Sequence, residues 1–106
     1  MNITSTNTDK YELYKNGNLI FKSGDYIDIA IAMLTCKFQE YNLRSSETDK
    51  GLKWELWVKT LNGPWTHVKS VKDLYTESYT IALEGICDQI TYYLSHSWGF
   101  EVGCLD

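Results

Sequence analysis

The chain has 106 residues, enough for one hydrophobic core and too few for a second, so a single domain spanning 1–106 is expected. Its apolar fraction of 43% excludes intrinsic disorder for the middle of the chain. The sequence has no run of 18 apolar residues, so no membrane-spanning helix is predicted. A net charge of −4 without a basic run argues against direct nucleic-acid binding. The first residues lack the basic and apolar regions of a signal peptide, so a cytoplasmic location is expected.

A first hairpin is predicted near the N-terminus. Residues 11–15 alternate between polar and apolar, 16–18 are turn formers, and 19–22 resume an apolar run. A three-residue loop is favoured, because it places Glu12 opposite Lys22, whereas a two-residue loop would oppose Glu12 with an aromatic ring. The sequence therefore predicts two antiparallel strands with a defined register.

The hairpin is followed by a predicted helix from Tyr26 to Asn42, with a capping oxygen available from Asp25. Its apolar residues recur at steps of four and three, which is the helical period. They are Ile27, Ile31, Leu34, Phe38 and Tyr41. Residues 44–51 show neither periodicity nor bulk and are interpreted as an exposed connector. The first unit of the chain thus covers residues 10–43.

A second unit, residues 52–96, follows the same plan. Residues 54–59 alternate, 62–64 form a turn and 65–70 return as a second strand. A second helix, capped by Thr76 or Asp73, ends near His96 before a glycine. Its apolar stripe consists of Tyr79, Leu83, Ile86, Ile90 and Tyr93 or Leu94. Gly85 interrupts this helix, where it either admits a close neighbour or is tolerated by packing.

The two units predict an α+β fold with the order ββαββα. Their first strands share the patterns Tyr-Glu-Leu-Tyr and Trp-Glu-Leu-Trp, which indicates an internal repeat, although convergent strand chemistry would produce the same likeness. We expect a four-stranded antiparallel sheet with two helices on one face, and flexible or partly ordered ends at 1–9 and 97–106. The expected inward residues of the sheet are Tyr11, Leu13, Phe21, Trp54, Leu56, Val58 and Val68.

The opposite face of this sheet is a candidate partner-binding surface. Tyr14, Ile20, Trp57 and Trp65 share the outward parity and would form an apolar patch rimmed by charge. Such a patch is typical of a protein interface. The alternative is that the connector, the C-terminal tail or a second copy of the chain covers it.

The second helix is a candidate acidic surface. Residues 73–106 contain no Lys or Arg and carry a formal charge of −6, whereas the rest of the chain carries +2. Glu77, Glu84 and Asp88 are spaced to lie on one stripe, roughly 10 and 6 Å apart along the helix axis, close to the scale of phosphate spacing on a nucleic-acid strand. The stripe could bind the basic channel of a nucleic-acid-binding protein. The alternative is an ordinary solvent-facing helix.

The sequence contains no motif of catalysis, metal binding or cofactor binding. It lacks a nucleophile elbow, a phosphate-binding loop and an H-E-x-x-H motif, so no enzyme, cofactor or metal is expected. His67 and His96 are isolated in sequence. Three widely spaced cysteines are interpreted as free thiols, with Cys36 and Cys87 buried in helices and Cys104 exposed.

These features favour a small, non-enzymatic protein-binding domain that acts as an inhibitor or regulator by occupying a partner's surface. The composition is compatible with a phage or mobile-element protein that disables a host defence factor by mimicking nucleic-acid charge. The alternative is a homodimeric structural or nucleic-acid-associated module whose aromatic face is buried between two copies.

Overall fold

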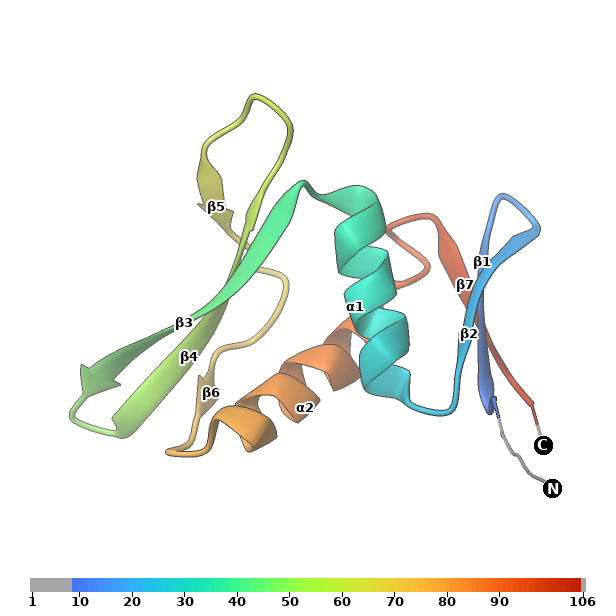
Figure 1. Cartoon of the computed structure of the whole chain (residues 1–106). Coiled ribbons are helices and arrows are strands. Elements are labelled where there is room, and N and C mark those ends of the chain that lie inside the picture. The colour runs from blue at the N-terminus through green and yellow to red at the C-terminus, as the bar shows by residue number, and fades with distance from the viewer. Residues whose placement is uncertain (1–8, 106) are drawn as a thin grey trace, which may run out of the picture.

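The computed structural model describes residues 9–105 of the chain. In this range, two α-helices and a π-helical segment lie between two antiparallel sheets of three and four strands (Figure 1). The α+β class is as predicted, but the single four-stranded sheet is not observed. The predicted flexible segment 1–9 lies, except for Asp9, outside the described residues.

The three-stranded sheet consists of the first hairpin and the C-terminus, in the order β2-β1-β7. Its strands are β1 (Tyr11–Lys15), β2 (Asn18–Ser23) and β7 (Phe100–Cys104). Thus residues 100–104, inside the end segment 97–106 that was predicted as flexible or partly ordered, pair along the whole length of β1. The first hairpin therefore completes its sheet with a strand from the opposite end of the chain, not with the second hairpin.

The register of the first hairpin is as predicted at its open end, where Glu12 pairs with Lys22. The predicted three-residue loop is wrong. Asn16 and Gly17 form a two-residue turn with φ angles of 53° and 79°, typical of a type I′ turn. A β-bulge between Leu13 and Tyr14 absorbs the one-residue difference. The sequence thus satisfies both the preferred turn and the preferred cross-strand pair.

Helix α1 (Tyr26–Lys37) begins where predicted and ends five residues early. The Asp25 carboxylate accepts a hydrogen bond from the Ile27 N–H at 2.9 Å and caps the helix. Its buried face is formed by Ile29, Ala30, Met33 and Leu34, and shares only Leu34 with the predicted stripe. Because α1 packs between both sheets and α2, it is apolar on several sides, and the period of its apolar residues does not identify one buried face.

The segment predicted as helix end and connector is instead a strand. Strand β3 (Glu40–Thr48) pairs over nine residues with β4 (Gly51–Lys59). Tyr41 and Leu43 lie opposite Val58 and Leu56 and pack against the core, whereas the polar half of β3 extends along the projecting arm of the hairpin (Figure 1). Backbone pairing stabilises this polar half without apolar side chains, which explains why residue composition did not reveal it.

Two short strands complete the four-stranded sheet. β5 (Trp65–His67) and β6 (Leu74–Tyr75) both pair with β4, in an antiparallel sense. The second predicted hairpin is therefore present as β4 and β5, with a shorter return strand than expected. Because β4 pairs with β3 and not with the first hairpin, the predicted internal repeat ββαββα is not confirmed.

The C-terminal helical region comprises α2 (Tyr79–Gln89) and the π-helical segment η1 (Ile90–Leu94). Its N-cap is Ser78, whose hydroxyl accepts from the Ile81 N–H at 3.2 Å, and not Thr76 or Asp73 as predicted. Gly85 admits the side chain of Leu74 from β6, since an added Cβ would collide with it. Gly99, at a φ of 87°, ends the region in a Schellman arrangement and redirects the chain into β7.

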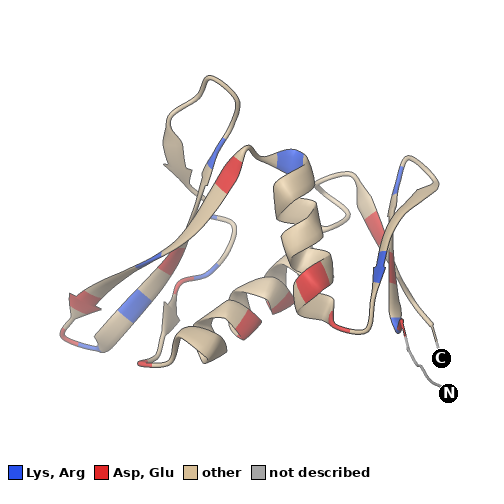
Figure 2. Cartoon of the chain, in the orientation of Figure 1, with Lys and Arg blue, Asp and Glu red and all other residues tan. Residues whose placement is uncertain are grey.

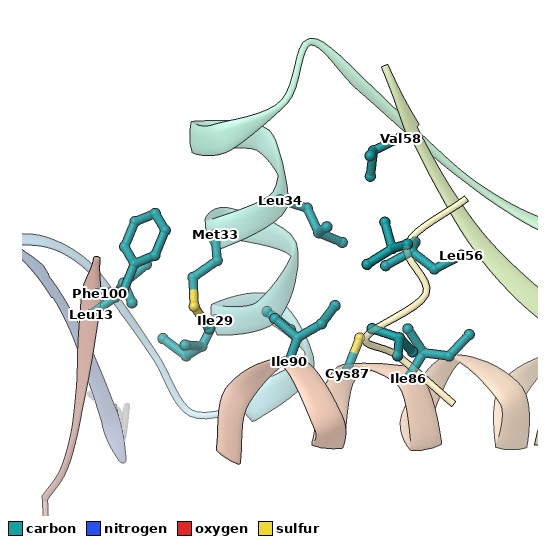
Figure 3. Close-up of a cluster of buried hydrophobic side chains, with 13 residues drawn as sticks. Leu13, Ile29, Met33, Leu34, Leu56, Val58, Ile86, Cys87, Ile90 and Phe100 are labelled. Atoms are coloured by element: carbon teal, nitrogen blue, oxygen red, sulfur yellow. The ribbon is translucent and has the colours of Figure 1, made fainter. Parts of the chain in front are cut away.

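The core runs through the helical layer from one sheet to the other (Figure 3). Leu13 and Phe100 contact it from the three-stranded sheet, and Leu56 and Val58 from the four-stranded sheet, all at most 5% exposed. Phe21, predicted to face inward, is 39% exposed because β2 is an edge strand. No helix in the described part of the chain is long and apolar enough to cross a membrane.

Candidate functional site

The outer face of the four-stranded sheet is one candidate site, and its composition follows from the alternation along β4. Leu56 and Val58 point to the helices and are buried, whereas Glu55 and Trp57 lie on the opposite face. Opposite Trp57, β5 contributes His67 on the same face. The outward parity predicted for this hairpin is observed.

Arg44 organises the aromatic side chains of this face. Its guanidinium carbon lies 4.4 Å from the ring centroid of Trp57 and 5.1 Å from that of Trp65. Trp57 also stacks on His67, with centroids 5.4 Å apart and planes inclined by 17°. The result is a ladder in which Arg44 lies between the two tryptophan rings through cation–π contacts and His67 stacks on Trp57, instead of an open apolar patch. Arg44 was not predicted here because residues 44–51 were interpreted as a connector.

A cluster of ionisable side chains adjoins the ladder. Glu55 accepts a hydrogen bond from the Trp57 indole N–H at 3.0 Å, and its second oxygen lies 3.3 Å from Lys53 Nζ. The indole bond, the lysine bond and the charges nearby lower the pKa of Glu55 below its ordinary value, against the opposing effect of burial. His67 Nε2 lies 3.9 Å from Glu55 and 3.4 Å from Asp73. Residues separated by up to 20 positions thus meet on one face.

The four residues of the predicted aromatic patch do not share a sheet. Trp57 and Trp65 are half-buried in the four-stranded sheet, whereas Tyr14 and Ile20 lie in β1 and β2 of the other sheet. The Tyr14 hydroxyl donates to Glu12 at 2.8 Å, a bond that raises the pKa of the phenol, and Ile20 is 43% exposed. The predicted patch required the two hairpins to pair with each other, and β7 and β3 occupy those positions instead.

The predicted acidic stripe is also divided. Glu84 and Asp88 are exposed on α2, four residues apart. Glu77 precedes the helix, and its carboxylate accepts a hydrogen bond from the Leu52 N–H at 3.1 Å, so it holds the start of β4. Helix α2 begins at Tyr79, after its N-cap Ser78, so Glu77 lies outside the helix and does not share a helical face with Glu84 and Asp88.

Two carboxylates of α1 join Glu84 and Asp88 in a larger acidic surface. Asp25 is the N-cap of α1 and Asp28 lies in its first turn, and Figure 2 shows acidic positions both at the start of α1 and on α2. Burial, Asp88, Glu84 and Asp25 together raise the pKa of Tyr26, in that order of effect. Burial followed by Asp25, Asp88 and Asp28 raises the pKa of Cys87 to about 12. The four carboxylates therefore act on the same part of the molecule.

Tyrosines lie within this acidic region. Tyr26 is half-buried, and its ring centroid is 6.4 Å from that of Tyr92, which is 58% exposed on η1. Burial, Tyr11 and Asp88 raise the pKa of Tyr92. We refer to the six residues from α1, α2 and η1 as the acidic tyrosine surface: Asp25, Tyr26, Asp28, Glu84, Asp88 and Tyr92. The sequence indicated its α2 part, but the contribution of α1 depends on how the helices cross.

The cysteines and histidines are dispersed among the described elements. Cys87 is buried as predicted and Cys104 is exposed as predicted, but Cys36 is exposed on α1, contrary to the prediction. His67 belongs to β5, and His96 is exposed in the turn after η1. The three cysteines are free.

No protein-family model, curated protein or solved structure matches this chain.

Proposed function

We propose that this chain is a non-enzymatic protein-binding domain that recognises a positively charged partner through the acidic tyrosine surface. The observation that carries the proposal is the convergence of four exposed carboxylates from the start of α1 and from α2: Asp25, Glu84 and Asp88 act on Tyr26, and Asp28 acts with Asp25 and Asp88 on neighbouring Cys87. They belong to separate segments of the chain, so the fold concentrates negative charge there.

Charge and aromatic chemistry favour a basic partner. Residues 73–106 supply no Lys or Arg to neutralise Glu84 and Asp88. Concentrated charge of one sign raises association rates with an oppositely charged surface, and tyrosines are enriched at protein interfaces. Exposed Tyr92 also offers a ring face to an incoming arginine or lysine. A partner of this chemistry is a protein whose basic channel binds nucleic acid, and occupying that channel would inhibit or regulate it.

Binding of a fluorescein-labelled oligoarginine peptide, followed by fluorescence anisotropy, tests this surface. The variant Glu84→Gln/Asp88→Asn removes two charges whose carboxylates make no hydrogen bond or salt bridge within the described residues. We expect it to weaken binding roughly fivefold or more at low salt. The difference from wild type should shrink as salt is added, because exposed charges are screened.

A matched control separates position from net charge. Glu47→Gln/Glu101→Gln neutralises two exposed carboxylates in β3 and β7 and changes the net charge by the same amount. The proposal requires this variant to bind nearly as tightly as wild type. Equal weakening by both pairs would show attraction to total charge and would refute a localised site. Tyr92→Ala should bind the peptide more weakly than wild type even at a salt concentration where the charges of the carboxylates are screened and no longer contribute.

A further inference from the structure

The ionisable cluster on the outer face of the four-stranded sheet has no part in the acidic tyrosine surface. One ligand-type atom from each of Glu55, His67 and Asp73 lies within 4.8 Å of the others. His67 Nε2 is inaccessible to solvent and has no hydrogen-bond partner in the described structure. A buried nitrogen without a partner is unusual, because the loss of hydration is not compensated. This nitrogen lies within 4 Å of one oxygen of each of two carboxylates.

We propose that Glu55, His67 and Asp73 form a binding site for a divalent transition-metal ion of the Zn²⁺ class. Imidazole nitrogen and carboxylate oxygen are ligands of this ion, at bond lengths of about 2.0 to 2.2 Å. Two ligands in a tetrahedral shell are then roughly 3.4 Å apart. His67 Nε2 and Asp73 Oδ1 are separated by 3.4 Å, and His67 Nε2 and Glu55 Oε2 by 3.9 Å. All three ligand atoms lie within 4.8 Å of one another, so movement of the Glu55 carboxylate toward the other two completes the three-ligand arrangement.

The backbone and Trp57 position these three ligands. Glu55 belongs to β4, His67 to β5, and Asp73 directly precedes β6, and both short strands pair with β4. The Trp57 indole N–H binds one oxygen of Glu55, while the other oxygen is the one nearest His67. The Trp57 ring also stacks on the imidazole and restricts its plane. Such supporting contacts are typical of metal ligands, whose orientation they maintain.

Lys53 is the competing cation of the site. Its ammonium nitrogen lies 3.3 Å from Glu55 Oε2, the oxygen that would bind the metal. The two carboxylates and Lys53 together leave one negative charge, so a divalent ion must displace or repel the ammonium group. The ligand side chains are 21 to 30% exposed, which leaves an open side for water as a further ligand. Removing the lysine charge should therefore strengthen metal binding.

Calorimetric titration of the full chain with Zn²⁺, after chelator treatment, tests the site near neutral pH. We expect a one-to-one complex. His67→Gln and Asp73→Asn should each weaken binding about tenfold or more, and Lys53→Met should strengthen it several-fold. His96→Gln removes an exposed histidine outside the cluster and should have no effect. Glu84→Gln/Asp88→Asn should also leave Zn²⁺ affinity unchanged, so this result is separate from the test of the proposed function.

Failure has a distinct outcome in each measurement. The proposal is wrong if the wild-type chain binds no Zn²⁺, or if His67→Gln binds it as tightly as wild type, since the ion would then be held by the exposed thiols or by His96. If His67→Gln does not fold, the Co²⁺ complex of the wild-type chain decides. Visible bands of nitrogen and oxygen ligation support the site, and thiolate charge-transfer bands overturn it.

Discussion

Replacement of Phe100 by alanine tests whether the C-terminal strand is part of the folded core. Phe100 is 1% exposed and lies beside Leu13 in the three-stranded sheet, with Lys15 Nζ 5.2 Å from its ring centroid (Figure 3). Truncating a fully buried phenylalanine removes transfer free energy and leaves a cavity, which together cost about 3 to 5 kcal/mol. For a domain of this size, the melting temperature should fall by roughly 12 to 20 °C.

Urea unfolding monitored by far-ultraviolet circular dichroism measures this loss. Leu105→Ala, at a position that is 42% exposed directly after β7, is the matched control and should change the free energy of unfolding by less than about 0.5 kcal/mol. If Phe100→Ala is as stable as Leu105→Ala, residues 100–104 do not contribute to the core. The three-stranded sheet would then be reduced to the first hairpin.

Two further predictions concern packing and thiol chemistry. Gly85→Ala should stabilise the chain by about 1 kcal/mol in a Leu74→Ala background and by less in the wild-type background, because the new methyl group meets the leucine side chain. Equal effects in both backgrounds, measured by thermal unfolding, would disprove that contact. The thiolate is the form of cysteine that iodoacetamide modifies, and burial and nearby carboxylates raise the pKa of Cys87 to about 12. Near pH 8, the reagent should therefore modify the exposed Cys36 and Cys104 in the folded chain and Cys87 only in denaturant. Mass spectrometry that finds Cys87 modified at the same rate would contradict this assignment.

Local patterns predicted the elements whose surroundings are simple. The first hairpin depends on a turn pair and one cross-strand ion pair, both of which act over a few residues. Strand β4 alternates cleanly, so Leu56 and Glu55 were assigned to opposite faces correctly. Helix α2 was recognised because Glu84 and Asp88 face solvent while Leu83 and Ile86 pack against the core, which is the condition under which helical periodicity is informative. Tyr79, also in the predicted stripe, is instead 54% exposed.

The same patterns failed where several layers meet. Helix α1 is enclosed on more than one side, so its apolar period did not show that it ends at Lys37. Strands β3 and β7 are stabilised by pairing with β4 and β1, and their own residues carry a weak strand pattern. These are effects of distant segments on local structure, which a short window of sequence does not contain.

The candidate sites divide along the same line. The sequence by itself determined the charge imbalance of residues 73–106 and the outward parity of Trp57 and Glu55. Only the tertiary structure decided that Asp25 joins Asp88, and that His67 meets Asp73, because those encounters depend on the helix crossing and on the register of β5 and β6 against β4. Residue chemistry specifies which side chains face solvent, and long-range backbone pairing specifies which of them become neighbours.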